Sequence, residues 1–221
     1  MEQHELALTQ LEEQKELIDA LGNFSKFLAK GVSKQVGKLS IKEGHKSIKD
    51  EIVQEVIDHV HEELIEIIKS TSREEAEELI DGMEANMVST CTITASANTT
   101  PTVFYELDAF NPALPWTAGS GTFVDILITL AAGENIASAV DGWTTFSLED
   151  LITSDPDMII LGDYPWVSPE DVMAREGWGT LRAVQNGWIY PINVDLVSRP
   201  GPRIFDGLEE LARIIHPELF E

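Results

Sequence analysis

Cysteine is nearly absent from the 221-residue sequence, in which Cys91 stands alone. A single cysteine excludes an intramolecular disulfide and leaves the redox compartment undecided. Long hydrophobic runs are also missing, and no apolar stretch approaches the roughly 20 residues that span a bilayer. The first twenty residues lack the basic start and apolar stretch of a secretory signal. We therefore expect the chain as written to stay where it was made, unless a leader was removed.

Basic residues are scarce, because 15 lysines and arginines face 39 aspartates and glutamates, giving a net charge of -24. Phosphate binding needs an excess of bases, so nucleic acid and anionic lipid are excluded as general partners. Such acidity is typical of a solvated surface. The hydrophobic fraction of 43% is that of a globular protein with a real core.

The few bases divide the chain into two chemically different parts. Every lysine lies at or before Lys69, and every arginine lies at or after Arg73. One continuous domain would rarely partition its bases in this way. We predict a helical segment over residues 1–70, a linker helix and a Ser/Thr-rich connection over 71–100, and an α/β lobe over 101–221.

The first segment has helical periodicity. Its apolar residues recur every four positions, at Ile52, Val56, Val60 and Leu64. Lysines between residues 26 and 46 also recur every four positions, which is typical of a solvated helix face and leaves a basic stripe as the alternative. His59 and His61 would point to different sides of a helix, so they are a poor metal pair.

The linker region starts with a helix signal and then becomes rich in Ser and Thr. Ser72 and Glu75 form the sequence pattern of a capping box. The buried stripe of this helix is expected at Ala76, Leu79, Ile80, Met83 and Met87. The Ser/Thr-rich residues 88–101 predict a linker or a poorly packed connection.

From Pro101 onward, strand patterns alternate with helix patterns. The strand patterns are TVFYEL, DMIILG and GWIYPIN, and the helix patterns are GTFVDILITLAAG (closed by Gly133), SLEDLITS, SPEDVMAR and PRIFDGLEELARII. This alternation predicts a three-layer, Rossmann-like α/β lobe with a mostly parallel sheet. Ligands usually sit at the carboxyl ends of such strands, which places residues 108–116, 163–166 and 193–202 on one functional edge.

Chemically reactive motifs are missing from this lobe. Gly119-Ser120-Gly121 opens a helix, either as a plain helix start or as an anion site made by free amides. The full dinucleotide fingerprint is absent, no serine has a nucleophile-elbow context, and no His/Cys/Asp cluster has metal-ligand spacing. We predict no enzyme, no metal site and no cofactor. An enzyme acting on a phosphorylated substrate at this helix start is the weakest alternative, because no acid–base set accompanies it.

Aromatic residues stand in or beside the predicted connections, at Trp116, Trp143, Tyr164, Trp166 and Trp178. Such rings at the edge of a sheet, with a few fixed polar groups, suit a bulky and partly apolar ligand. The alternative is that the rings cap the ends of the sheet. The two interpretations are balanced for Trp143 and Tyr164, whereas Trp178 favours the structural one.

Five stretches carry a resemblance to a known family. They are PTVFYELD, WTAGSGTFVDILITLAAGENIA, FSLEDLITSDPDMIILGD, GWGTLRAVQNGWIYPINVDLVSRPGPRI and DGLEELARIIHPELF. From about Ser72 to the end, the chain resembles the linker helix and carboxyl-terminal lobe of the cobalamin and ferric-siderophore class of ABC-transporter substrate-binding proteins. The order and spacing of the five stretches make the resemblance more specific than any one of them.

The resemblance implies roles for individual residues. Trp143 lies six residues before Glu149, as does the ligand-stacking tryptophan of the cobalamin-binding members. Asp195 and Arg199 match polar positions of the loop that faces the ligand, and Trp116 and Tyr164 complete the ligand-binding candidates. Glu149 matches the acidic residue that docks onto the membrane permease. Without the resemblance, Glu149 is a first-turn charge that favours the helix dipole.

The two arginines near the end of the chain have different expected roles. Pro200 and Pro202 stiffen the loop, so Arg199 would be held towards the ligand with little entropy left to lose. Arg203, in the first turn of the last helix, is badly placed for the helix dipole. We expect Arg203 to pair with an acidic residue of the fold.

The resemblance implies a solute-binding component of an ABC importer for a corrinoid or iron-siderophore ligand, with a permease transmembrane subunit as partner. It also implies an extracytoplasmic location, with a cytoplasmic fragment as the alternative. Family members bind between two lobes, whereas a helical segment here takes the place of the first lobe and of its docking glutamate. The alternative function is a non-catalytic interaction module that oligomerises through this segment and retains the lobe as a scaffold.

Overall fold

The computed structural model describes residues 73–199 and 201–220. The predictions made for residues 1–70 and for the cap at Ser72 lie outside the described residues.

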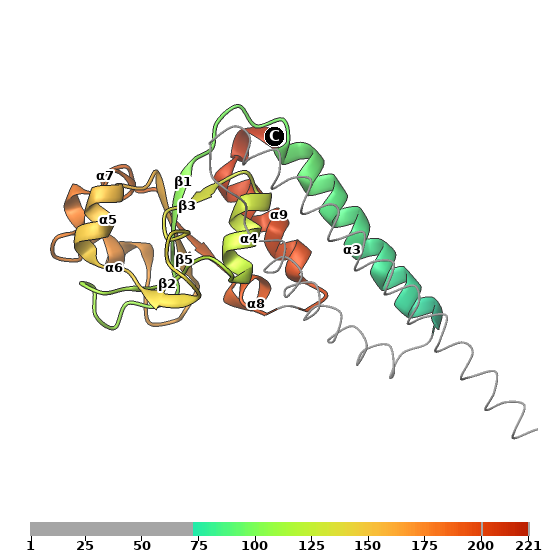
Figure 1. Cartoon of the computed structure of the whole chain (residues 1–221), viewed down its shortest axis with the longest axis horizontal. Helices are drawn as coiled ribbons and strands as arrows, with labels where there is room; N and C mark the ends of the chain where they lie inside the picture. Colours follow the sequence, from blue (N-terminus) through green and yellow to red (C-terminus); the bar gives the residue numbers. More distant parts are fainter. Residues whose placement is uncertain (1–72, 200, 221) are drawn as a thin grey trace, which may run out of the picture.

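A four-stranded parallel sheet forms the centre of the described fold (Figure 1). Its order is β3-β1-β5-β6, with β1 at Thr102–Glu106, β3 at Glu134–Asn135, β5 at Met158–Gly162 and β6 at Ile189–Ile192. Every residue of β5 is buried, as expected of a central strand with both faces covered. The parallel α/β architecture predicted from the sequence is confirmed.

Helices cover both faces of this sheet. Alternate residues of its strands point to opposite sides, so each face has its own apolar cluster. Val103 and Tyr105 of β1 belong to one apolar cluster, and Phe104 between them belongs to the other. The helices are α3 (Arg73–Thr94), α4 (Phe123–Leu130), α5 (Leu148–Ser154), α6 (Pro169–Met173), α7 (Arg182–Asn186), α8 (Val194–Val197) and α9 (Ile204–Ile215), with 3-10 turns at Trp178–Thr180 and Pro217–Leu219. Buried residues of α4, α8 and α9 join the first cluster, whereas those of α5, α6 and α7 join the second.

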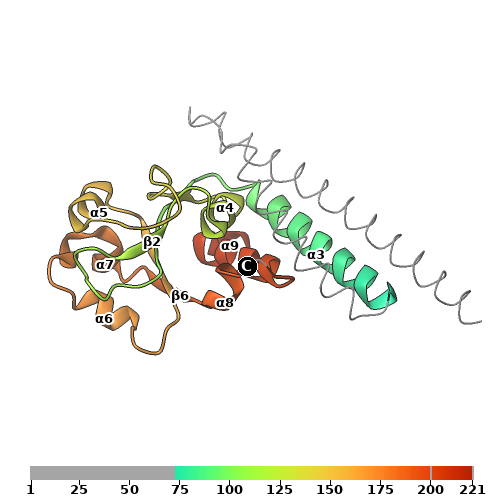
Figure 2. The same ribbon diagram turned by 60° about the horizontal axis from the view of Figure 1, so that its bottom comes forward.

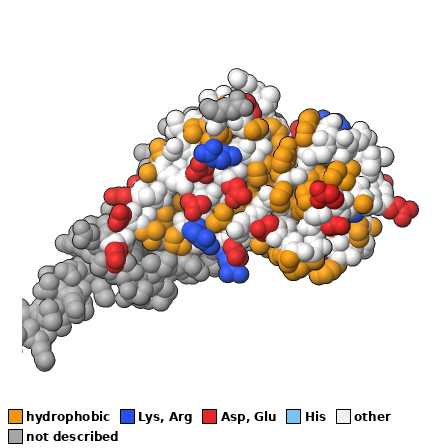
Figure 3. Space-filling model, turned by 180° about the vertical axis from the view of Figure 1, so that it is seen from behind, with side chains coloured by type: hydrophobic (Ala, Val, Ile, Leu, Met, Phe, Trp, Pro, Cys, Tyr) orange, Lys and Arg blue, Asp and Glu red, His pale blue; other side chains and the backbone are white. Residues whose placement is uncertain are grey.

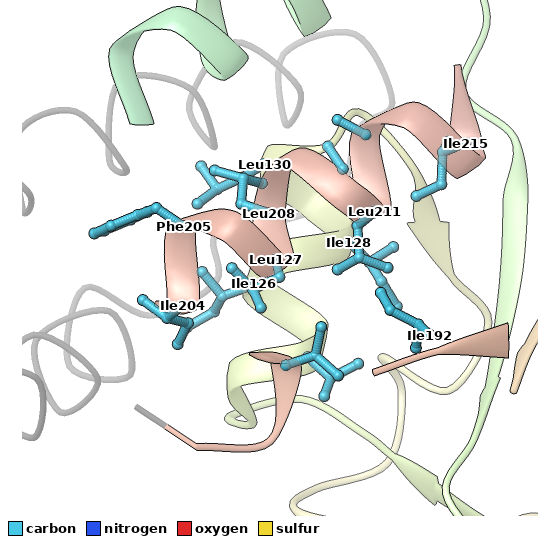
Figure 4. Packing of buried hydrophobic residues seen from close by; sticks show 14 of the residues in the cluster. Ile126, Leu127, Ile128, Leu130, Ile192, Ile204, Phe205, Leu208, Leu211 and Ile215 are labelled. Carbon is cyan, nitrogen blue, oxygen red and sulfur yellow. The ribbon is translucent and has the colours of Figure 1, made fainter. Parts of the chain in front are cut away.

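The first cluster is built mainly by α4 and α9. Figure 4 shows Leu208 and Leu211 of α9 beside Leu127 and Ile128 of α4, with Ile192 of β6 next to them. Burying one such side chain stabilises the fold by roughly 1.5–3 kcal/mol. Helix α3 packs against α9 on the side away from the sheet (Figure 2). The buried stripe predicted for α3 is confirmed, with only Leu79 partly exposed.

Helix α3 runs to Thr94, so the prediction of a loose connection from residue 88 is wrong for residues 88–94. Within the helix, the Thr92 hydroxyl donates to the Val88 carbonyl over 2.6 Å. The buried Thr94 hydroxyl donates to the Leu130 carbonyl over 3.0 Å and ties α3 to the end of α4. Thr94 therefore fastens the end of this helix to the lobe.

The end of α4 also differs from the prediction. The left-handed residue is Ala132, with φ of 61°, whereas Gly133 follows it and donates its amide to the Ile128 carbonyl over 2.9 Å. This pattern is a Schellman motif with alanine at the position where glycine is preferred. Gly133 also stands in a tight space, because a Cβ there would lie 3.0 Å from the Ile215 side chain and 3.1 Å from the Ile128 side chain.

A second, antiparallel sheet pairs β2 (Trp116–Ala118) with β4 (Trp143–Thr145). The Leu107 amide donates to the Trp116 carbonyl over 2.9 Å, which joins β2 to the end of β1. This small sheet was not predicted, because three-residue strands are too short to show an alternating pattern.

Candidate functional site

The carboxyl ends of β1, β5 and β6 lie at one edge of the sheet, because the three strands are parallel. We call this the carboxyl edge, formed by loops 107–115, 163–168 and 193–203 with the small β2–β4 sheet. The Val194 amide donates to the Asp163 carboxylate over 3.1 Å and joins two of the loops. Figure 1 shows β2 and α8 at this same end of the molecule. The edge is the one that the sequence predicted.

Trp116 and Trp143 lie on the same side of the small sheet. Trp116 pairs with Thr145, and Trp143 pairs with Ala118, so the two tryptophans are diagonal neighbours. Such neighbours are about 7–8 Å apart, which aromatic side chains can span. Their side chains are 44% and 41% exposed. Thr117, between them in the pleat, points inward and donates its hydroxyl to the Tyr105 carbonyl over 2.6 Å.

Tyr164 and Trp166 form a second aromatic pair, in the loop after β5. Their rings are stacked with centroids 4.7 Å apart and an interplanar angle of 13°. Trp166 is 60% exposed. Partial burial raises the pKa of the Tyr164 hydroxyl, and the negative charges of Asp108, Asp163 and Asp195 raise it further. The hydroxyl therefore stays protonated at neutral pH and can donate a hydrogen bond.

Asp195 and Arg199 pair with each other across α8. The Arg199 Nε lies 3.2 Å from the Asp195 carboxylate, and both side chains are well exposed. Asn193 caps α8 by accepting the Asp195 amide over 2.9 Å. The loop therefore presents a paired carboxylate and guanidinium to solvent.

Arg203 is exposed at the start of α9, and no ion pair joins it to another described residue. The expected pairing of Arg203 with an acidic residue of the fold is therefore wrong. Of the two arginines, Arg199 is the one that pairs, with Asp195 of α8 four residues before it. Sequence spacing could have indicated this pair, since residues four apart on a helix are neighbours.

Tyr105 supports the 193–203 loop from below. Its ring is buried in the first cluster, and its hydroxyl lies 3.4 Å from the Ser198 hydroxyl. Burial raises the pKa of Tyr105 to about 12, so the hydroxyl remains neutral. The pattern of β1 predicted a buried strand but gave no sign of this contact.

Trp178 is fully buried in the second cluster, which confirms its structural role. Its indole Nε1 donates to the Pro112 carbonyl over 3.0 Å. Beside it, Arg175 forms a two-bond ion pair with the buried Glu106. Sequence reasoning missed this pair, whose members stand 69 positions apart.

Glu149 lies in the first turn of α5, on the exposed side of that helix. Ser147 caps α5 by accepting the Asp150 amide over 3.0 Å, and Glu149 itself is exposed. The residue before it, Leu148, donates its amide to the Ala113 carbonyl of loop 107–115, and β4 with Trp143 leads directly into α5.

The Gly-Ser-Gly sequence is a plain helix start. Thr122 is the N-cap of α4, and the amides of Gly119 and Ser120 donate to carbonyls of Gly142 and Val140 over 2.9 and 2.7 Å. A buried carboxylate, Asp125, occupies the first turn of α4. Anion binding, the alternative for this motif, is not supported because two of its three amides are used and a negative charge stands beside it.

Figure 3 shows acidic side chains spread over one face of the molecule, with only a few basic side chains between them. Among residues 73–199 and 201–220, no group of three or more His, Cys, Asp and Glu side chains is arranged to hold a metal ion. No helix in that part of the chain is long and apolar enough to cross a membrane.

Comparison with known proteins identifies relatives of a large part of the chain. The family described as periplasmic binding protein matches residues 55–195. This match begins upstream of Ser72, the residue from which the sequence resemblance was expected to extend. A Bacillus subtilis protein described as an uncharacterized ABC transporter substrate-binding lipoprotein, YvrC, is 30% identical over 152 residues. A cobalamin-binding protein of Halobacterium salinarum is 27% identical over 128 residues.

Among solved structures, a possible iron-binding (periplasmic solute-binding) protein from Staphylococcus epidermidis is similar, with a TM-score of 0.59 and 28% identity. The similarity covers 78% of this chain and 64% of that protein. The sequence matches cover 68% and 52% of this chain but only 47% and 32% of the Bacillus and Halobacterium proteins. The chain thus spans less than half the length of these two relatives. The chain belongs to the periplasmic binding protein family, and one of its relatives is described as an ABC transporter substrate-binding lipoprotein.

Proposed function

We propose that the chain is a solute-binding component of an ABC importer and that its carboxyl edge binds a corrinoid or iron-siderophore ligand. The exposed Trp116–Trp143 pair carries this proposal. Two large rings on one side of a small sheet leave apolar area in water unless a partner covers it. A bulky ligand with apolar faces is such a partner.

The polar groups around the tryptophans suit a ligand rich in amide or hydroxamate oxygens. The protonated Tyr164 hydroxyl is available to donate a hydrogen bond, and the Asp195–Arg199 pair supplies an acceptor and a donor on the neighbouring loop. The names of relatives support the same class: one is a cobalamin-binding protein, and one solved structure is of a possible iron-binding protein. The chain therefore acts by binding, with no chemical step.

We also propose that Glu149 is the contact with the permease and that the working protein is extracytoplasmic. Glu149 is an exposed carboxylate in the first turn of α5. A rim charge of this kind mainly guides docking and fixes its orientation.

Removal of the Trp143 ring tests the ligand site. The purified protein is titrated with cyanocobalamin, cobinamide and ferric hydroxamate siderophores, and heat and tryptophan fluorescence are followed. For the ligand that binds, we expect Trp143→Ala to raise the dissociation constant by about 30-fold. This corresponds to the loss of about 2 kcal/mol of binding free energy, the lower bound for one interface hot spot. Trp188→Ala is the matched control, because Trp188 is 44% exposed but stands just before β6, at the amino edge of the sheet.

Equal effects of the two tryptophan variants would contradict the proposed site. If none of these ligands binds and the apparent molecular mass of the protein rises with its concentration, the interaction module is supported instead. Ligand binding and molecular mass are measured on the same samples, so the solute-binding function and the interaction module can be distinguished directly.

Charge reversal at α5 tests the permease contact. We expect Glu149→Arg to weaken binding to the reconstituted permease about tenfold or more while ligand affinity is unchanged. Glu170→Arg is the control, since Glu170 occupies the same place in α6, after the cap Ser168 and before Asp171. A similar loss with both variants would mean that general charge, and not Glu149, guides docking.

A further inference from the structure

The ion pair between Glu106 and Arg175 stands at the carboxyl end of β1. Glu106 is the last residue of that strand and is completely buried, and the Arg175 side chain is 10% exposed. The guanidinium donates two hydrogen bonds to the carboxylate, of 2.5 and 2.8 Å. Burying two charges is costly, and an apolar pair of similar volume often serves stability as well. The feature that an apolar pair would lack is the fixed geometry of the two parallel bonds.

The pair is connected to loop 107–115 through Trp178. The Arg175 guanidinium lies 4.6 Å from the centre of the Trp178 ring, over its face. The same indole donates its Nε1 hydrogen to the Pro112 carbonyl. Arg175 therefore fixes the ring that holds the middle of the loop.

Loop 107–115 supports two functional surfaces at once. One hydrogen bond joins the two ends of this loop. The Trp116 amide donates to the Asp108 carbonyl over 2.6 Å, next to the exposed tryptophan pair. Between these points, the Ala113 carbonyl accepts the Leu148 amide over 3.0 Å. The Pro115 carbonyl accepts the Phe146 amide over 2.9 Å. The loop thus bonds the backbone immediately before Glu149.

We propose that Arg175 is a positioning residue: by holding Glu106 and Trp178 it sets loop 107–115, and through that loop it sets both the tryptophan pair of the carboxyl edge and the first turn of α5. The ligand part of this inference rests on the proposed function. It adds a role for the buried Glu106 and Trp178 and for Arg175 between them, and it links the two surfaces through one segment.

The test replaces the ion pair without leaving a buried charge. Arg175→Met alone would strand the Glu106 carboxylate and endanger folding, so the informative variant is Glu106→Met/Arg175→Met in the full chain. Arg213→Met is the matched control, because Arg213 also combines a carboxylate partner, Glu209, with an aromatic ring, Phe220, at the far end of α9.

The first measurement is amide hydrogen exchange by NMR in the ligand-free protein. We expect the amides of Phe146, Leu148 and Trp116 to exchange at least ~10-fold faster in the double variant, whereas amides of β5 keep their wild-type rates. A purely structural role would change exchange throughout the domain or not at all. Either of those results, or the same local change in Arg213→Met, would overturn the proposal.

The second measurement is the affinity for cyanocobalamin, or for the ferric hydroxamate if that is what the wild-type protein binds. We expect the dissociation constant to rise ~10-fold in the double variant and to stay unchanged in Arg213→Met. Unchanged affinity in a double variant with a loosened loop would overturn the link to the ligand. If the wild-type protein binds none of these ligands, the proposed function fails, and the exchange rates alone decide whether Arg175 positions the loop.

Discussion

Asp125 is a carboxylate held inside the lobe, in the first turn of α4. Its side chain is almost inaccessible, and its partner is the Asn135 amide, 2.7 Å away. Asn135 uses the same amide nitrogen to donate to the Ala118 carbonyl over 2.8 Å, which ties α4 to both β2 and β3. Burial raises the pKa of Asp125 to about 6, although the hydrogen bond from Asn135 opposes the shift.

This raised pKa predicts a stability that falls as the pH rises. The ordinary value is 3.8, so between about pH 4 and pH 6 the folded state holds the proton more tightly than the unfolded chain. The contribution of Asp125 to stability is therefore complete below pH 4 and is lost as the pH passes 6. We expect Asp125→Asn to gain roughly 3 kcal/mol relative to the wild-type protein between pH 4 and pH 7.

Urea unfolding of both proteins at several pH values measures this difference. Asp150→Asn controls for the loss of an exposed first-turn carboxylate. Parallel stability curves for the wild-type protein and Asp125→Asn would show that Asp125 titrates alike in the folded and unfolded states.

At the scale of elements, the main strands were predictable because each is a short apolar run between turn signals. Residues 102–106, 158–162 and 189–192 all fall within the predicted strand patterns. Helix α6 was predictable from its own cap, since Ser168 and Asp171 form a capping box. The β2–β4 sheet was not, because its stability comes from pairing between segments far apart in the sequence.

The start of α4 depends on close contact between backbones. A Cβ on Gly119 would collide with the Val140 carbonyl, on which the Ser120 amide also depends. We expect Gly119→Ala to destabilise the protein by about 3 kcal/mol or more. Gly82→Ala is the control within a helix, where a Cβ meets nothing within 4 Å.

Gly82→Ala should stabilise the protein by about 0.5–1 kcal/mol, because alanine has the better helix propensity. Thermal unfolding of both glycine variants provides the comparison. A tolerated Gly119→Ala would mean that the 140–142 loop can move away from the helix start.

At the scale of the whole molecule, the proposed ligand site lies at the carboxyl edge of the described sheet, and the chain spans less than half the length of the Bacillus and Halobacterium relatives. The topology rule for parallel sheets was sufficient to locate that edge from the sequence. It could not reveal the Glu106–Arg175 pair, because nothing in either local segment points to the other. The roles expected of Arg199 and Arg203 also overlooked the four-residue spacing at which Asp195 becomes the partner of Arg199.

The measurement that tests the central claim most directly is an NMR titration of the five indole Nε1–H signals, assigned by single Trp→Phe variants. Cyanocobalamin, and gallium(III) complexes of hydroxamate siderophores, serve as diamagnetic ligands. If the carboxyl edge binds the ligand, the signals of Trp116, Trp143 and Trp166 shift and saturate together, while that of Trp188 stays in place. Saturable binding that shifts Trp188 and leaves the signals of Trp116 and Trp143 unmoved would contradict the account.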